Sequence, residues 1–298
     1  MNYIENLKHC TACPRRCGIN RVDGKVGFCT ATDKIKVAKY MLHFWEEPCI
    51  SGKSGSGTVF FSGCPLRCEF CQNHEISEKC VGRETSCDEL ATIFLELQNM
   101  GANNINLVSP TIYVYQIIEA VKIAKAKGLK LPIIYNTSGY ENVETIKLLS
   151  GIIDVYLPDF KYASDILARK YSKVSNYVDN VENVLKEMVY QVGNVEFDEN
   201  GLIKKGVIIR HLILPNNVLN SKLVLKWIRD NLGSDVYVSI MAQYFPTHKA
   251  LDDKTLNRKI TKEELDSVLE YAESIGLKNG YVQELGSHEE EYVPKFNC

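Results

Sequence analysis

The sequence has no long apolar run and almost no net charge. The first eight residues contain no apolar core, so we expect no secretory signal. No stretch of about 18 apolar residues occurs, so we expect no transmembrane helix. The 35 Lys and Arg residues against 37 Asp and Glu residues give a net charge of −2, which offers no bulk attraction to nucleic acid or membranes. These absences predict a cytoplasmic protein without a membrane or nucleic-acid partner.

Cysteine is the residue that the chain has in excess, with 11 among 298 residues. The rest of the composition is that of an ordinary globular protein. Disulfides are rare in a reducing cytoplasm, and an odd number of cysteines cannot pair completely. Metal binding is therefore the better explanation for clustered cysteines. Two clusters are present: Cys10, Cys13, Cys17 and Cys29 in CTACPRRCGINRVDGKVGFC, and Cys64, Cys68 and Cys71 in SGCPLRCEFCQN.

The two clusters differ in what they can bind. Three thiolates suit three corners of a 4Fe–4S cluster and leave the fourth iron open, so the second set is the candidate catalytic centre. Four cysteines can instead fill a tetrahedral Zn²⁺ site. For the first set two alternatives stay open, a structural zinc ion that staples the N-terminal segment or a second iron–sulfur cluster that relays electrons. A zinc module for nucleic acid would need stacking aromatics that this segment lacks.

After residue 57, short β-rich runs alternate with helical patterns. Ser86 with Glu89 and Thr261 with Glu264 stand in capping-box positions. Six strand–helix units are too few for a closed eight-stranded barrel, which favours an α/β fold with an open, partial (βα)6 TIM-like barrel over a doubly wound sheet. Strands are expected over 58–62, 104–108, 132–136, 153–157, 207–214, 236–241 and 281–285, and helices over 86–100, 113–127, 141–149, 163–171, 178–190, 221–232 and 261–275.

Two additions to the barrel are expected. A cysteine-rich metal-binding extension covers residues 1–40, ahead of the barrel at 41–298. A small β-hairpin is inserted over 194–206, where Asn200-Gly201 predicts a type I′ turn. Function is expected where the parallel strands end. The polar segments at those ends are SGCPLRCEFCQN, SPT, NTSGYE, PDFKY, LPNN and AQYFP.

The spacing Cys64-x3-Cys68-x2-Cys71 after a first strand, with Phe70 before the last cysteine, resembles the cluster motif of the radical S-adenosylmethionine (SAM) superfamily. Further segments resemble its pyruvate formate-lyase activating enzyme-like branch, and the resemblance covers essentially the whole chain. They are CxxCPRxCxxNR at the N-terminus, EEPCISGKSGSGTVFFSGC, NTSGYE, YLPDFKYA, RHLILPNN and MAQYFPTHKA.

The resemblance implies a radical SAM oxidoreductase. Cys64, Cys68 and Cys71 would hold a 4Fe–4S cluster that cleaves SAM reductively, giving a 5′-deoxyadenosyl radical that abstracts hydrogen from a substrate. The electron would come from a low-potential donor of the flavodoxin or ferredoxin type. The implied substrate is a glycyl-radical enzyme, with a peptide or small molecule as the alternative. The competing hypothesis is a non-enzymatic metal-binding regulatory or scaffold protein.

The resemblance also indicates residues that contact SAM. Asp159 and Lys161 match a D-x-K pattern after the fourth strand, and a lysine ammonium suits the SAM carboxylate. A Ser109-Pro110-Thr111 segment stands where many activating enzymes have Gly-Gly-Glu, so only hydroxyls and carbonyls can accept from the SAM ammonium there. The full set of expected contacts is Phe70, Ser109, Thr111, Asn136, Ser138, Asp159, Lys161 and Gln243.

Two residues just before the first strand have no assigned role. His43 and Glu46 have the appearance of a metal pair, but nothing in the sequence places a third ligand with them. Cys49, in the EEPCISG segment, is expected close to the active site.

Overall fold

Strands and helices alternate along the chain in the computed structural model, which describes residues 3–283. The sheet order is β10-β9-β8-β6-β5-β4-β2-β1-β3, with β7 paired to β8. Every neighbouring pair from β2 to β10 is parallel. The strands are β1 Ile35–His43, β2 Ser56–Phe61, β3 Arg83–Thr85, β4 Ile105–Val108, β5 Ile133–Thr137, β6 Val155–Pro158, β7 Glu196–Phe197, β8 Ile203–Leu212, β9 Tyr237–Met241 and β10 Gly280–Val282.

The sheet is open. Within residues 3–283 its end strands, β10 and β3, pair with one neighbour each and not with each other. The six strands expected from the apolar runs are β2, β4, β5, β6, β8 and β9. The strand expected over 281–285 is β10 in its described part, and residues 284 and 285 lie outside the described residues. The partial (βα)6 TIM-like architecture is thereby confirmed.

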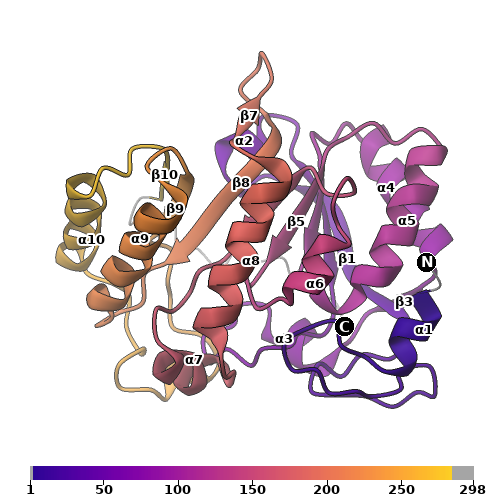
Figure 1. Cartoon of the computed structure of the whole chain (residues 1–298), viewed down its shortest axis with the longest axis horizontal. Coiled ribbons are helices and arrows are strands. Elements are labelled where there is room, and N and C mark those ends of the chain that lie inside the picture. Colours follow the sequence, from indigo (N-terminus) through magenta and orange to yellow (C-terminus); the bar gives the residue numbers. More distant parts are fainter. Residues whose placement is uncertain (1–2, 284–298) are drawn as a thin grey trace.

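Helices follow the strands across the sheet, from α4 and α5 on the right to α9 and α10 on the left (Figure 1). Both predicted capping boxes are present, because Ser86 and Thr261 accept from the backbone N–H of Glu89 and Glu264. No helix within residues 3–283 is long and apolar enough to cross a lipid bilayer. The α-helices are α1 Tyr3–Lys8, α2 Pro48–Ser51, α3 His74–Lys79, α4 Cys87–Asn99, α5 Val114–Ala126, α6 Val143–Lys147, α7 Asp165–Ser172, α8 Tyr177–Val192, α9 Val218–Leu232 and α10 Lys262–Ser274, with 3₁₀ turns at Thr111–Tyr113 and His248–Leu251.

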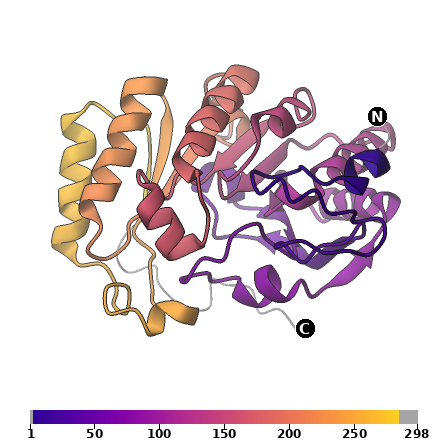
Figure 2. The same cartoon turned by 60° about the horizontal axis from the view of Figure 1, so that its bottom comes forward.

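The sequence pattern did not predict the two antiparallel strands at one edge of the sheet. β1 pairs with β2 from Val37 opposite Phe61 to His43 opposite Ser56, and β3 pairs with β1 on the other side. β1 therefore continues the barrel sheet across residue 40, where the expected extension ends. The N-terminal segment ahead of β1, drawn in indigo, lies at the lower right in Figure 1 and on the right in Figure 2.

The inserted hairpin forms, but its turn differs from the prediction. β7 pairs with the first residues of β8, so the hairpin is an N-terminal extension of the fifth parallel strand. Gly201 has a positive φ of 75° and Asn200 does not, which excludes the type I′ turn. The Asp198 carboxylate accepts from the N–H groups of Asn200 and Leu202, and this local bonding selects a turn over Asp198–Gly201 instead.

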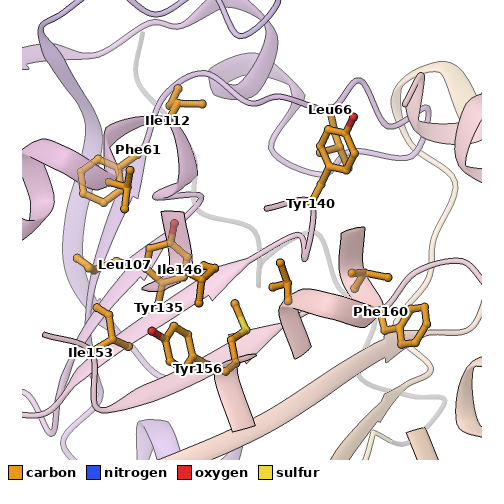
Figure 3. Packing of buried hydrophobic residues seen from close by; sticks show 14 of the residues in the cluster. Phe61, Leu66, Leu107, Ile112, Tyr135, Tyr140, Ile146, Ile153, Tyr156 and Phe160 are labelled. Atoms are coloured by element: carbon orange, nitrogen blue, oxygen red, sulfur yellow. The ribbon is translucent and has the colours of Figure 1, made fainter. Parts of the chain in front are cut away.

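The core lies between the strands and the helices that follow them. Figure 3 shows Phe61, Leu107, Tyr135 and Tyr156 on neighbouring strands. The rings of Tyr135 and Tyr156 meet edge to face with centroids 6.0 Å apart, and both side chains are fully buried. Because each such side chain contributes about 1.5–3 kcal/mol on burial, this layer fixes the strand ends that carry the polar residues described next.

Candidate functional site

The carboxyl ends of the parallel strands enclose a pocket of about 480 Å³, within the usual range for small-molecule sites. Five of the six polar segments predicted at strand ends contribute to it, and LPNN is the exception. The lining includes Cys64, Cys68, Phe70 and Cys71 after β2, Ser109 after β4, Asn136 and Ser138 at the end of β5, Asp159 and Lys161 after β6, and Gln243 after β9.

The three cysteines lie on a loop that begins at a constrained glycine. Gly63 follows β2 with φ of 86°, and a Cβ there would lie 2.7 Å from the Cys29 carbonyl oxygen. Only glycine fits this approach, which brings the cysteine loop against the N-terminal segment. The Cys68 Sγ lies 3.0 Å from the Ser172 hydroxyl, the Cys71 Sγ lies 3.4 Å from the Ser77 hydroxyl, and the Leu66 N–H donates to the Cys64 Sγ.

Burial keeps the three thiols protonated in the absence of a cation. It raises the pKa of the Cys68 thiol to about 11, although Lys161 beside it acts in the opposite direction. Burial also raises the pKa of Cys64 and Cys71, and the neighbouring cysteine adds to the effect on Cys64. A cluster that binds here must therefore displace protons, which is a cost that strong iron–thiolate bonds can offset.

Asp159 and Lys161 form an ion pair in the pocket wall, with the Nζ and Oδ2 atoms 2.5 Å apart. Burial alone lowers the pKa of the Lys161 ammonium, but the Asp159 carboxylate and Cys68 outweigh it and raise the pKa. Lys161 is therefore charged at neutral pH and close to the cysteine loop. Gly139, with φ of 76°, packs against this segment, since a Cβ there would lie 2.3 Å from the Asp159 carbonyl oxygen.

The two hydroxyl residues after β4, Ser109 and Thr111, lie in different places. Ser109 lines the pocket and adopts a left-handed conformation with φ of 59°, which is unusual for serine. Thr111 does not line the pocket. It is buried, and its hydroxyl donates over 2.6 Å to the carboxylate of Glu141. The structure therefore brings Ser109, and not Thr111, to the other predicted SAM contacts.

Sequence reasoning missed a largely buried cluster of charges in the pocket wall, next to the Asp159 segment. Arg210 on β8 pairs with both Glu46 and Glu47, which follow β1, and Arg210 and Glu46 also line the pocket. Asn106 donates over 2.8 Å to Glu46. An arginine inside the otherwise apolar run VIIRHLIL, together with the adjacent acidic residues of EEP, is the signal that would have found this pairing.

His43 and Cys49 occupy different places. His43 lines the pocket, and burial lowers the pKa of its imidazole. Cys49 is buried in a separate apolar cluster with Ile50 and Ile134, and it does not line the pocket. Among the described residues, no group of three or more His, Cys, Asp or Glu side chains is drawn together closely enough for a single metal ion.

Comparison with known proteins identifies the family. The sequence profile of the radical SAM superfamily matches residues 58–190. The uncharacterized protein MJ0674 of Methanocaldococcus jannaschii is 32% identical over 285 residues, which cover 91% of this chain and 76% of that protein.

One solved structure supports the fold. HydG, a maturase of the FeFe-hydrogenase, has a TM-score of 0.52 at 11% identity over 74% of this chain, which spans about half of HydG (49%). A domain of a pyruvate-formate lyase-activating enzyme from Bacteroides vulgatus has a TM-score of 0.43 at 14% identity, over 61% of this chain and 100% of that domain. Because the profile match includes the cysteine loop and most of the strand ends that line the pocket, the chain belongs to the radical SAM superfamily.

Proposed function

We propose that this protein binds a 4Fe–4S cluster through Cys64, Cys68 and Cys71, binds SAM in the strand-end pocket, and abstracts a hydrogen atom from a glycine of a partner protein. One observation carries the proposal: the three cysteines and the Lys161–Asp159 pair line the same pocket. A pocket of this size with a few convergent charged groups is typical of a cofactor site.

The cysteine loop fits a 4Fe–4S cluster better than a single ion. Each thiolate of such a cluster binds a different iron, so the sulfurs need not converge on one point. Three cysteines would hold such a cluster and would leave one of its irons without a protein ligand. When bound together, cluster and SAM supply a 5′-deoxyadenosyl radical, which is the reactive species of the family.

The chain's own residues orient SAM and exclude water. The charged Lys161 can donate to the SAM carboxylate, and Asp159 can accept from its ammonium or ribose hydroxyls. Tyr177 holds this segment, because its hydroxyl accepts from the Lys161 N–H and shares its single proton between the carbonyl oxygens of Ser138 and Asp159. Phe70 is buried and packs edge to face on Tyr244, with ring centroids 6.0 Å apart. These rings form an apolar wall beside the cluster.

The pocket mouth supports a polypeptide substrate. Phe44 and Trp45, between β1 and α2, line the pocket while 49% and 56% exposed. Large exposed aromatics at a site entrance are typical of surfaces that bind proteins. We therefore expect a polypeptide substrate, and the family resemblance favours a glycyl-radical enzyme. The same resemblance favours a low-potential flavodoxin or ferredoxin as the electron donor and a reaction in the cytoplasm.

Reductive SAM cleavage tests the chemistry. Anaerobically purified protein, given dithionite and SAM, should release 5′-deoxyadenosine. Cys68→Ala should abolish the release, whereas Cys87→Ala, at a half-buried cysteine outside the pocket, should retain it. A folded wild-type protein that produces no 5′-deoxyadenosine after reconstitution would overturn the enzymatic proposal and favour a scaffold role.

Isotope transfer tests the substrate. Candidate partner proteins carrying deuterated glycine should pass deuterium into 5′-deoxyadenosine. Deuterium that appears only with labelled free small molecules would refute the polypeptide substrate while leaving the SAM chemistry intact.

A further inference from the structure

The N-terminal cysteines lie against the cysteine loop of the pocket. Arg15 donates through Nε to the Pro65 carbonyl over 2.6 Å, and Arg67 donates to the Phe28 carbonyl over 2.5 Å. The Arg15 guanidinium also stacks on the Phe28 ring at 3.3 Å. Together with the close approach of Cys29 to Gly63, these contacts join the two cysteine-bearing segments into one surface.

Three of the four N-terminal cysteines are buried although the segment has little core of its own. Cys10, Cys13 and Cys29 are at most 9% exposed, and Cys17 is exposed. The backbone folds tightly around them, because Cys10 exchanges hydrogen bonds with Gly18 and Ile19 and the Arg16 N–H donates to the Cys13 carbonyl. A tight chain that buries several thiols is typical of a metal-binding loop.

Arg21 gives the second, independent observation. Its side chain is only 1% exposed, yet no carboxylate of the described residues lies within ion-pair distance of it. Its Nε donates to the Thr32 carbonyl, its Nη1 donates to the Ile112 carbonyl and lies 3.9 Å from the Cys10 Sγ, and its Nη2 has no partner.

A guanidinium cannot lose its proton in a protein, so burying one without an anion is very costly. The Tyr113 ring, whose centroid lies 5.6 Å from the guanidinium carbon, offers only a partial negative charge. A full negative charge is therefore expected from a group beside Arg21. The Cys10 sulfur is within reach, and as a thiolate it would supply that charge.

We propose that Cys10, Cys13, Cys17 and Cys29 bind a metal centre as thiolates and that Arg21 is its buried counter-charge. The four sulfurs do not converge on one point among the described residues, so the metal must draw them together when it binds. Four thiolates around either Zn²⁺ or an iron–sulfur cluster then carry surplus negative charge, which a fixed cation beside Cys10 stabilises. The centre holds the N-terminal segment against the cysteine loop of the pocket. Both metals share this chemistry, and metal analysis distinguishes them.

The metal content of the full chain tests the four proposed cysteine ligands, and this measurement does not depend on SAM cleavage. Anaerobically prepared Cys64→Ala/Cys68→Ala/Cys71→Ala protein should retain about one zinc or about four irons per chain. Adding Cys13→Ser should remove this metal, and adding Cys80→Ala, at another buried cysteine, should not. A triple variant that takes up neither zinc nor iron and sulfide overturns the centre, and metal retained after Cys13→Ser overturns the ligand set.

Cobalt substitution tests Arg21. Arg21→Met should weaken Co²⁺ binding by about 10- to 100-fold, as loss of a residue behind the ligands typically does, and should shift the thiolate-to-cobalt charge-transfer band. Arg21→Lys should restore much of the Co²⁺ affinity and of the original band position, because it keeps the positive charge. Arg16→Met is the matched control, since Arg16 is exposed and pairs with Glu144. Equal Co²⁺ affinity and an unshifted band in Arg21→Met refute the role of Arg21 as counter-charge. If Arg21→Met does not fold, the Co²⁺ affinity and band of Arg21→Lys test the same role.

Discussion

Glu141 should make the protein less stable as the pH rises from 5 to 8. The side chain is fully buried after β5, and its Oε1 atom accepts from Thr111, Thr137 and Tyr135. The Oε2 atom is buried without a partner. Burial raises the pKa of the carboxyl from 4.5 to about 7, against the effect of the three donors.

The sign and size follow from proton linkage. Between pH 4.5 and 7 the folded protein keeps the proton that the unfolded chain releases, so the free energy of unfolding falls as the pH rises through this window. The whole window corresponds to about 3 kcal/mol, of which about 2–3 kcal/mol lies between pH 5 and 8. Glu141→Gln has no proton to lose, and its carbonyl oxygen can still accept from the same three donors.

Chemical denaturation at pH 5 and pH 8 measures the difference. Wild-type protein should lose about 2–3 kcal/mol more than Glu141→Gln between these pH values. All other titrating groups are common to both proteins, so the comparison isolates this carboxyl. Glu144→Gln, at an exposed position of the same segment, should behave like wild type. Parallel pH profiles for wild type and Glu141→Gln would refute the reasoning.

Three further substitutions test the pocket and its supports. Lys161→Met removes a charged donor and should weaken SAM binding by about 10- to 100-fold, measured by calorimetry; unchanged affinity would exclude Lys161 as a SAM contact. Arg210→Met leaves the buried Glu47 and the largely buried Glu46 without their cation and should lower the free energy of unfolding by about 3–5 kcal/mol. A loss below about 1 kcal/mol would show that water or rearrangement satisfies them. Gly139→Ala clashes with the Asp159 carbonyl and should destabilise more than Gly151→Ala, which has the same backbone strain and open space around it; equal losses in thermal unfolding would contradict the clash.

Local patterns predicted the parts of the fold that depend on neighbours in the chain. The capping boxes at Ser86 and Thr261 and the order of parallel strands could be predicted because caps and periodicity act over a few residues. The prediction of a type I′ turn in the hairpin was wrong, because the Asp198 carboxylate, and not the Asn-Gly pair, determines the turn. β1 was missed because its partner strand lies beyond the reach of a local pattern.

The sequence by itself indicated the family and the candidate site, because Cys64, Cys68 and Cys71 stand on a single loop within the segment that matches the radical SAM profile. Only the tertiary structure decided which groups surround that loop. Arg210 meets Glu46 and Glu47 across more than 160 residues, and Arg21 meets Ile112 across 91 residues. Such pairs form when packing brings distant strands and loops together and burial leaves each charge in need of a partner. The periodicity of apolar residues along the sequence does not indicate which distant charges will pair.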